Sequence, residues 1–514
     1  MSATRAPSVP PASFGLTVGD FLRKHAVGRP SAIALEGAGG PLTFVELDLR
    51  VNRLANALAR RGIGRGDRVA VYSENHPTYL ELELAAAKLG AIVACLNWRL
   101  AAAELAHCIE LAAPSLLFVS ERFAGALERV AHRVPQVLRV ESEYEALLAD
   151  ADGGDPGTAV EPEDGLVILY TSGTTGFPKG ALISHRAMIA RAMAFSSEFG
   201  ITGADSFLAW SPLFHMAATD FSLATLMLGG KVLVRDGLDV DAASALLERE
   251  SLGWLIAMPG MIEGLIAGLE RKRPRVRSLK LVGAMADLVP RHQIAQLTAL
   301  LGAPYLNSFG STETGLAPAT GATIGVGEVP ATLSKRESSW CRVRLVDPED
   351  RDVPAGVPGE ALVRGPTLFS GYWNAPQANA RDFRGGWFHL GDLFVRNADG
   401  TLDFVDRIKY LIKSGGENIY PAEIERVLLA HPEVADAVVV RRRDERWGEV
   451  PVAFVARKSE KAGEAELLAA CRAALAGYKM PKEIRFVNAA DFPRSSTGKI
   501  QRHEVEKWLG GAGG

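Results

Sequence analysis

Cysteine is scarce in this chain of 514 residues. The four thiols are far apart and show neither CxxC nor any other metal-ligand spacing: Cys95, Cys108, Cys341 and Cys471. A disulfide framework or a structural zinc site needs closely grouped cysteines. We therefore expect reduced thiols, as in a cytoplasmic protein.

Long apolar runs and targeting signals are also missing. The stretch 84–96 is short for a membrane-spanning helix and is interrupted by Lys88. Residues 1–15 are rich in Ser, Pro and Ala but lack the apolar core of a signal peptide, so we expect a disordered tail. Residues 510–514 carry no peroxisomal or lipidation signal. The expected location is the cytoplasm, without a membrane partner.

An excess of positive charge is absent too. The 57 Lys and Arg residues nearly balance the 60 Asp and Glu residues, for a formal net charge of −3. Because binding to a nucleic-acid backbone needs a strong positive field, nucleic acid is not an expected partner. A chain of 514 residues exceeds one ordinary hydrophobic core, so two or three lobes are expected.

Helical and strand-like patterns alternate along most of the chain. Thr43 and Glu46 have the spacing of a capping box, and apolar residues recur at helical spacing up to Leu58. Short apolar runs such as 69–72 and 166–169 are candidate buried strands. This alternation is typical of a layered α/β fold.

The pattern changes between about residues 360 and 404, where short β runs surround turns such as Asp399-Gly400. Helix and strand patterns resume after Asp406, including a helix over 421–429. We expect a large N-terminal domain (residues 16–408) with α/β subdomains and a small β subdomain. A small α+β C-terminal domain (residues 409–514) is expected to follow.

The segment 169–180, LYTSGTTGFPKG, carries the strongest chemical signal. Glycines let backbone N–H groups converge, hydroxyls add donors, and a lysine adds a point charge, which together suit a polyphosphate. A plain surface turn is the alternative on these residues alone. A P-loop NTPase would need Gly before the lysine and Ser or Thr after it, where this chain has Pro178 and Gly180. The candidate ATP-binding residues are Thr171, Ser172, Gly173, Thr174, Thr175, Gly176 and Lys179.

This segment resembles the TSGTTGxPKG signature of the adenylate-forming superfamily, which includes acyl- and aryl-CoA ligases, adenylation domains of peptide synthetases, and luciferases. Later segments match the family in order, so the resemblance covers about residues 20–505. It implies ATP, Mg²⁺ and coenzyme A as cofactors and co-substrates. It also implies an acid–thiol ligase that activates a carboxylic acid as an acyl-adenylate and transfers it to CoA.

Two segments of the large domain resemble the family's acid and ATP motifs. PLFHM (212–216) resembles the segment bordering the acyl pocket, which implies a catalytic role for His215; on the residues alone, a packed core histidine is equally ordinary. NSFGSTE (307–313) resembles the YGSTE motif. By resemblance, Phe309 stacks on adenine in place of the usual Tyr, and Thr312 lies near the α-phosphate. Glu313 is then catalytic and ligates Mg²⁺.

The remaining motifs lie around the expected domain boundary. GWFHLGD (386–392) resembles the segment whose Asp392 accepts the ribose hydroxyls, although Leu390 replaces the usual Thr. The resemblance also implies that Arg407 contacts ribose and phosphate. The other implied roles are a hinge at Lys409, a CoA tunnel at Gly415 and Gly416, and a catalytic ammonium at Lys499. It further implies that the small domain is mobile and rotates between the two half-reactions.

The acid pocket is expected around one unusual charge, Asp220. Because a buried carboxylate needs a donor, Asp220 favours an acid with an amino or hydroxyl group, such as an amino- or hydroxybenzoate. The alternative is that Asp220 bonds a backbone amide or an arginine. Lys335, in the atypical stretch 333–340, contacts either substrate or solvent. By motif alignment, the pocket is lined by His215, Ala217, Asp220, Val282, Gly283, Ser308, Leu316 and Ala317.

Other functions remain open at this point. A medium-chain or alicyclic acid is the alternative substrate, and a separate carrier protein is the alternative acceptor. The basic run 441–443 is either a contact for the phosphates of CoA or a solvated cluster. Luciferase-type oxidation has no support in the sequence. A nucleotide-binding protein without turnover would be expected to lack Lys179, Glu313, Asp392 or Lys499, and all are present.

Overall fold

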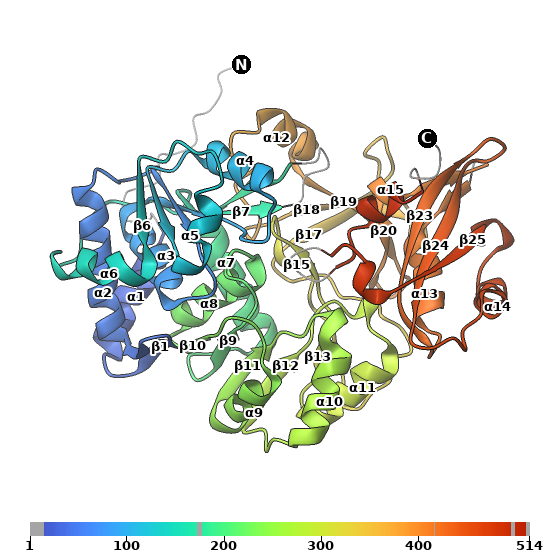
Figure 1. Cartoon of the computed structure of the whole chain (residues 1–514), viewed down its shortest axis with the longest axis horizontal. Coiled ribbons are helices and arrows are strands. Elements are labelled where there is room, and N and C mark those ends of the chain that lie inside the picture. The colour runs from blue at the N-terminus through green and yellow to red at the C-terminus, as the bar shows by residue number, and fades with distance from the viewer. Residues whose placement is uncertain (1–14, 172–176, 416, 495–498, 510–514) are drawn as a thin grey trace.

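The computed structural model describes residues 15–171, 177–415, 417–494 and 499–509. These residues form a large mixed α/β N-terminal domain and a smaller C-terminal domain, which lies to one side in orange and red (Figure 1). This arrangement confirms the predicted fold class. The predicted tail, residues 1–15, falls almost entirely outside the described residues.

The first large sheet is a six-stranded layer in the order β6-β5-β3-β4-β7-β8. Its strands pair in parallel except for the last, β8, which runs antiparallel to β7. Most central positions are buried, as predicted for parallel strands covered on both faces. The strands are β3 (Arg68–Tyr72), β4 (Ile92–Cys95), β5 (Leu116–Val119), β6 (Gln136–Arg139), β7 (Gly165–Thr171) and β8 (Lys179–Ser184).

The second large sheet has eight strands in the order β16-β13-β12-β11-β9-β10-β1-β2. Its inner strands are parallel, and antiparallel strands close both edges. The strands are β1 (Ile33–Gly37), β2 (Gly40–Thr43), β9 (Ser206–Ala209), β10 (Lys231–Val234), β11 (Ser251–Leu255), β12 (Ser278–Val282), β13 (Tyr305–Leu306) and β16 (Thr323–Ile324).

Helices cover these sheets and join them through one core. A single buried cluster contains Leu35 of β1, Val69 of β3 and Phe207 of β9, together with residues of the intervening helices. Helix α3 is buried over its whole length, as expected for an element enclosed by its neighbours. The helices are α1 (Val18–Gly28), α2 (Phe44–Arg60), α3 (Pro77–Leu89), α4 (Ala102–Ala112), α5 (Glu121–Leu127), α6 (Val140–Ala149), α7 (His185–Phe199), α8 (Met216–Leu228), α9 (Val240–Arg249), α10 (Ile262–Lys272), α11 (Arg291–Leu301) and α12 (Pro376–Asp382).

The predicted capping box at the start of α2 is confirmed. The Thr43 hydroxyl accepts a hydrogen bond from the Glu46 N–H (3.3 Å), and the Glu46 carboxylate accepts one from the Thr43 N–H (2.8 Å). Such a cap stabilises a helix by about 1 kcal/mol.

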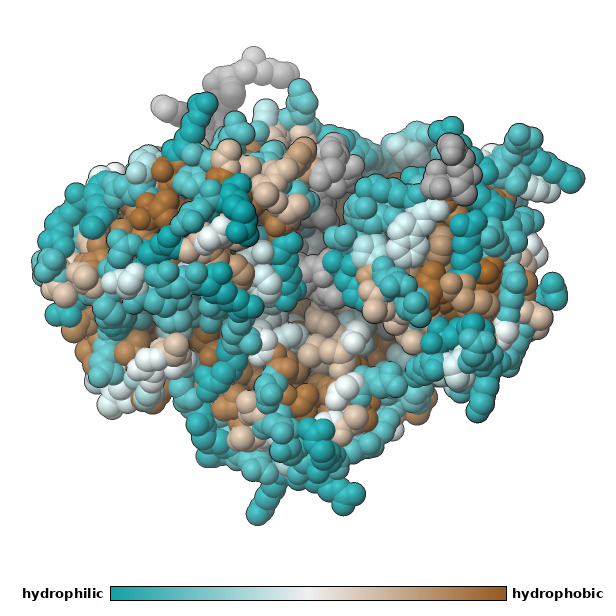
Figure 2. All heavy atoms as spheres, in the orientation of Figure 1, coloured by the Kyte–Doolittle hydropathy of each residue, from teal (hydrophilic) through white to brown (hydrophobic). Residues whose placement is uncertain are grey.

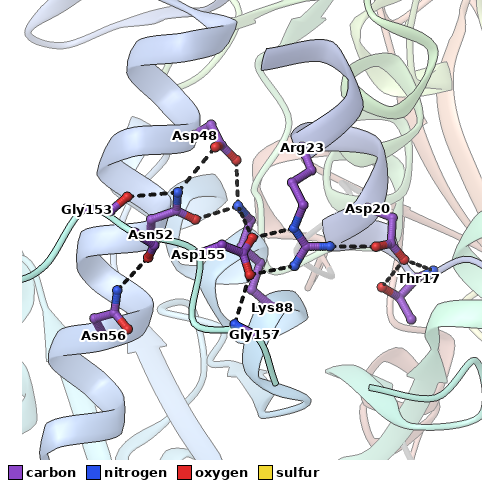
Figure 3. Close-up of polar contacts among 11 residues, drawn as sticks. Thr17, Asp20, Arg23, Asp48, Asn52, Asn56, Lys88, Gly153, Asp155 and Gly157 are labelled. Atoms are coloured by element: carbon purple, nitrogen blue, oxygen red, sulfur yellow. Dashed lines mark hydrogen bonds and ion pairs between the residues drawn. The ribbon is translucent and has the colours of Figure 1, made fainter. Parts of the chain in front are cut away.

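A polar network fastens the first three helices to each other. The Lys88 ammonium is fully buried and donates to Asp48 and Asn52, each at 2.5 Å (Figure 3). Asp155 lies 3.5 Å from the same ammonium and also pairs with Arg23 of α1. Lys88, which interrupts the apolar run 84–96, therefore joins α3 to its neighbouring segments. None of the helices in the described ranges combines the length and apolar character needed to cross a membrane.

The small β subdomain is a four-stranded antiparallel sheet, β17-β18-β19-β20. The predicted turn at Asp399-Gly400 joins β19 to β20 and is confirmed. A separate hairpin, β14 with β15, carries the NSFGSTE segment. The strands are β14 (Phe309–Ser311), β15 (Gly315–Ala319), β17 (Arg342–Val346), β18 (Gly359–Arg364), β19 (Phe388–Arg396) and β20 (Leu402–Arg407).

The C-terminal domain is a five-stranded sheet with three helices in the described residues. Asp406, at the end of β20, accepts from the Ala422 N–H (2.8 Å) and lies 3.4 Å from Arg502, which also pairs with Glu425. These contacts fasten the C-terminal helices to the last strand of the small β subdomain. The elements are β21 (Ile412–Ser414), β22 (Glu417–Ile419), α13 (Pro421–Leu429), β23 (Val434–Asp444), β24 (Gly448–Arg457), α14 (Glu464–Ala474), β25 (Glu483–Val487) and α15 (Arg502–Lys507).

Candidate active site

The candidate phosphate loop lies at the turn of the β7–β8 hairpin. Thr171 ends β7 and is paired in register with Lys179, the first residue of β8. The predicted contacts from Ser172 to Gly176 lie outside the described residues. The Lys179 ammonium lies 3.6 Å from the centre of the Tyr372 ring and 3.5 Å from a carboxylate oxygen of Asp382. Neither Tyr372 nor Asp382 is among the predicted site residues.

Glu313 lies in the turn of the β14–β15 hairpin. Its carboxylate accepts a hydrogen bond from the Tyr372 hydroxyl (2.8 Å), and its backbone carbonyl accepts one from the Phe369 N–H (2.8 Å). The neighbouring Thr312 carbonyl accepts from Arg191 (3.0 Å). The turn that carries the expected Mg²⁺ ligand is thus held by residues from two other segments.

Phe309 lies at the base of the same hairpin. Its ring packs against Phe394 and Phe404, with centroids 4.9 and 4.8 Å apart, and only 7% of the residue is exposed. The Phe309 ring meets Phe394 edge-on and is tilted by 30° against Phe404, so it is held in place by both. Its contact with adenine stays a prediction.

Asp392 and Arg407 are directly opposite each other on β19 and β20. The Arg407 Nε lies 3.2 Å from an Asp392 carboxylate oxygen, yet that buried oxygen has no hydrogen-bond partner among the described residues. Burial raises the pKa of Asp392 to about 6, although the positive charges of Arg407 and Lys499 oppose this rise. A buried carboxylate with an unsatisfied acceptor fits the expected contact with a diol.

Lys499 comes from the C-terminal domain and reaches the same group of charges. Burial, followed by the positive charge of Arg407, lowers its pKa to about 8, while Asp392 and Asp287 act in the opposite direction. Figure 2 shows a recess between the N-terminal domain and the C-terminal elements. The structure brings Lys499 into electrostatic range of Asp392 and Arg407, and its catalytic role stays a prediction.

His215 is the N-cap of α8. Its Nδ1 accepts from the Ala217 N–H (3.2 Å), so the ring also has an ordinary structural role. Burial is the main cause that lowers the pKa of His215 to about 4, and Lys499 and Arg99 add to the effect. The imidazole is therefore neutral at physiological pH.

Asp220 lies further along α8 and pairs with Arg191 of α7. The guanidinium is 2.8 Å from Asp220 Oδ2, and both side chains are almost fully buried. The arginine partner that the sequence left as an alternative is thus present. Asp220 Oδ1 has no hydrogen-bond partner among the described residues.

A small cavity next to Asp220 has room for about one water-sized group. Three of the predicted pocket residues share this cavity: Asp220, Leu316 and Ala317. The buried Thr367 hydroxyl also lines it and, like Asp220 Oδ1, lacks a hydrogen-bond partner in the described chain. The cavity is therefore lined by both apolar and polar side chains, and two of its residues, Asp220 and Thr367, each carry an unsatisfied polar atom.

The other predicted pocket residues do not line this cavity. Val282 is fully buried in the core of the eight-stranded sheet, and Ser308 is 3% exposed. The Tyr305 ring occupies the space that a Cβ at Gly283 would need, since the nearest ring atom would be 2.1 Å away. Lys335 does not contact solvent, because it is fully buried and pairs with Asp287 at 2.7 Å.

The predicted hinge and CoA residues lie in the C-terminal domain and its connection. Lys409 lies in a single 3₁₀ turn (Ile408–Tyr410) between β20 and β21. Gly415 donates its N–H to the Trp447 carbonyl (2.8 Å) and lies under the Trp447 indole, which leaves no space for a Cβ. Gly416 is outside the described residues. In the basic run, Arg441 pairs with Glu506 and Arg442 with Glu483.

The chemistry of the site suits Mg²⁺ carried by a nucleotide. Among the described residues there is no cluster of three or more His, Cys, Asp or Glu side chains able to hold a metal ion. Mg²⁺ bound with a nucleotide needs only one or two protein carboxylates, because phosphates and waters supply the other ligands. Glu313, partly exposed beside Lys179 and Tyr372, fits that requirement.

Comparisons with known proteins cover both domains. Residues 22–373 match the model of the AMP-binding enzyme family, and residues 423–499 match its C-terminal domain. The chain is 35% identical to a feruloyl-CoA synthase of Amycolatopsis sp, over 96% of this chain and 99% of the relative. It is 34% identical to an indoleacetate–CoA ligase of Aromatoleum aromaticum, over 96% and 98%.

Solved structures agree with this assignment. The o-succinylbenzoate-CoA synthetase of Bacillus subtilis, in complex with its acyl-adenylate intermediate, superposes with a TM-score of 0.82 at 27% identity, over 95% of this chain and 97% of that one. ATP-bound MatB from Rhodopseudomonas palustris gives 0.83 at 28% identity, over 96% and 100%. The chain therefore belongs to the AMP-binding enzyme family, as an acid–thiol ligase that forms an acyl-adenylate and uses ATP, Mg²⁺ and coenzyme A.

Proposed function

We propose that the acid substrate is a small substituted aromatic acid of the amino- or hydroxybenzoate type. The observation that carries this proposal is the water-sized cavity with two unpartnered polar atoms, Asp220 Oδ1 and Thr367 Oγ1. One hydroxyl or amino group on a ring would fill it and donate to the carboxylate. Relatives named for ferulate, indoleacetate and 2-succinylbenzoate all act on acids that contain a ring, which supports the proposal.

In the first half-reaction we assign the nucleotide to residues of the large domain. Lys179 and the loop from Thr171 hold the β- and γ-phosphates, and Asp392 accepts the ribose hydroxyls beside Arg407. A carboxylate oxygen of the acid bonds to the α-phosphorus, and the bond from that phosphorus to pyrophosphate breaks. Mg²⁺ held by Glu313 neutralises phosphate charge when bound. The Lys499 ammonium stabilises the negative charge that develops between the carboxylate and the phosphate.

In the second half-reaction the thiol of coenzyme A attacks the acyl carbonyl and AMP leaves. We assign this step to a rotated C-terminal domain, with the boundary after residue 408, the hinge at Lys409, and Gly415 and Gly416 lining the tunnel. Lys499 is within electrostatic range of Asp392 in the present arrangement, so rotation would withdraw it from the site. The neutral His215, at the start of α8, would border the thioester-forming site.

The proposed substrate is tested by pyrophosphate release with benzoate, aminobenzoates, hydroxybenzoates, cyclohexanecarboxylate and octanoate, each with and without coenzyme A. We expect CoA-stimulated release, with one hydroxy- or aminobenzoate preferred over benzoate by about tenfold or more. Turnover of octanoate or cyclohexanecarboxylate alone would contradict the assigned role of Asp220. If CoA does not stimulate pyrophosphate release with any of the acids, the acyl acceptor would instead be a carrier protein.

A further inference from the structure

The segment from Phe369 to Trp373 physically joins the two parts of the phosphate site. Its backbone lies along the free edge of β8: Leu182 donates to Gly371 (3.0 Å), and the Trp373 N–H donates to Gly180 (2.7 Å). Its other end holds the neighbouring hairpin, because the Phe369 N–H donates to the Glu313 carbonyl (2.8 Å). One short stretch is thus hydrogen-bonded to the strand of Lys179 and to the turn of Glu313.

The side chain of Tyr372 makes the same connection. Its hydroxyl donates to the Glu313 carboxylate at 2.8 Å, and its ring lies beneath the Lys179 ammonium at 3.6 Å from the centroid. Both interactions act on charged groups, one as a charge-assisted hydrogen bond and the other as a cation–π contact. A single tyrosine therefore contacts the lysine and the carboxylate on which the nucleotide phosphates and Mg²⁺ are expected to converge.

Tyr372 is itself held firmly. Only 6% of the residue is exposed, and its ring meets Phe369 edge-on at 4.9 Å. Its N–H donates to the Asn379 side chain (2.7 Å), and the Asn379 amide donates back to the Tyr372 carbonyl (2.9 Å). Burial and the nearby Glu313 charge raise the pKa of Tyr372, so the phenol keeps its proton and remains a donor.

We propose that Tyr372 is a positioning residue that holds Lys179 with its ring and Glu313 with its hydroxyl, and so sets the phosphate and Mg²⁺ contacts in one arrangement before ATP arrives. This inference rests on the proposed roles of Lys179 and Glu313. Preorganised charges of this kind are more effective because they need not reorient when the ligand binds. The nucleotide-binding signature does not include Tyr372, which lies 193 positions beyond Lys179 in the chain.

Two substitutions separate the two contacts. Tyr372→Phe keeps the ring under Lys179 but removes the donor to Glu313, and Tyr372→Leu removes both. The matched control is Trp373→Phe in the same segment. The readout is the dissociation constant of ATP, measured by calorimetry on the full chain in EDTA and again with saturating Mg²⁺. Thermal melting of each variant checks that it is folded.

Tyr372→Phe is expected to bind ATP in EDTA within about twofold of the unsubstituted chain, since the cation–π contact persists. Its gain in affinity on adding Mg²⁺ should fall by about tenfold, as for the loss of a hydrogen bond to a charged group. Tyr372→Leu should also bind ATP in EDTA about threefold to tenfold more weakly. In a Lys179→Met background the two variants should bind ATP in EDTA alike.

An unchanged Mg²⁺ gain in Tyr372→Phe would overturn the role of the hydroxyl. Equal binding of ATP in EDTA by the Phe and Leu variants would overturn the role of the ring. If Tyr372→Leu does not fold, the Phe variant alone still decides whether the hydroxyl acts on Glu313. Should the unsubstituted chain itself bind ATP no more tightly with Mg²⁺, the proposed role of Glu313 would fail, and not this inference alone. Unchanged ATP binding in EDTA by Lys179→Met would likewise contradict the proposed role of Lys179.

Discussion

Lys88, in the helical layer of the N-terminal domain, and Lys499, a partly exposed residue of the C-terminal domain, have different surroundings. Lys88 is fully buried and has Asp48 and Asn52 oxygens at 2.5 Å (Figure 3). Lys335 is similar, with Asp287 at 2.7 Å. Lys499 forms no ion pair among the described residues, and burial and Arg407 lower its pKa to about 8.

This difference in partners distinguishes two roles that a lysine charge can have in a protein. A lysine whose ammonium is already compensated contributes to the fold, because its removal leaves a carboxylate without a partner. A lysine left short of negative charge is unfavourable to the fold but is ready to stabilise charge that develops on a substrate. We therefore expect that replacing Lys88 lowers the stability of the fold with little effect on turnover. Replacing Lys499 should lower turnover without a loss of stability.

The largest expected change in stability follows Lys88→Met. Removal of the ammonium takes the donor from Asp48 Oδ1 and from the Asn52 side-chain oxygen, both on α2, which should cost about 3 kcal/mol. The midpoint of thermal or urea unfolding measures this loss. Pyrophosphate release per folded molecule should change little, since Lys88 bonds to Asp48, Asn52 and Asp155 and to none of the predicted site residues. An unchanged midpoint would mean that the network in Figure 3 does not stabilise the fold.

Lys499→Met is the counterpart in the cleft. Acid-dependent pyrophosphate release should fall by about 10²–10³-fold, the usual effect of removing one group that stabilises developing charge. The melting midpoint should stay constant or rise, because burial opposes the charged form of Lys499. In the unsubstituted chain, release should decline as the pH rises through about 8, where the ammonium is lost. In Lys499→Arg, any activity that remains should not show this decline.

Asp392 extends the comparison to a buried carboxylate. Because its pKa is raised to about 6, it is ionised at pH 7 and becomes protonated as the pH falls. If only the carboxylate accepts the ribose hydroxyls, adenosine should bind about tenfold more weakly at pH 5 than at pH 7. Adenosine is the suitable probe because it has no phosphate to titrate. Asp392→Asn should bind adenosine more weakly at pH 7 and show no such pH dependence; the same slope in both proteins would contradict the assignment.

The elements that the sequence predicted well are those with local causes. The helix over 421–429 is α13 (Pro421–Leu429), which begins at a proline in its first position, and the Thr43 capping box starts α2. Lys179, Glu313, Asp392 and Arg407 could be singled out because each lies in a continuous segment that resembles a family motif, and their roles stay predictions.

The contacts that the sequence did not predict are all non-local. Tyr372 reaches Lys179 and Glu313 because its segment extends the edge of β8, and no pattern around residue 372 indicates that pairing. The partner of Asp220 is Arg191, on a neighbouring helix. Lys335 was ambiguous because its burial depends on Asp287, which lies in a different segment. Which charge is compensated is decided by tertiary packing, and a single sequence does not record it.

The smallest expected effect concerns Asp382, whose carboxylate only partly compensates the charge of Lys179. Its carboxylate is 3.5 Å from the Lys179 ammonium and also pairs with Arg381, so it competes weakly with phosphate for the lysine. Asp382→Asn should tighten ATP binding in EDTA by about twofold to threefold, as for removal of a partly exposed ion pair. The same substitution in a Lys179→Met background should have no effect. Weaker binding would mean that Asp382 holds Lys179 in place instead of competing for it, and Lys179 would then belong with Lys88 as a compensated charge.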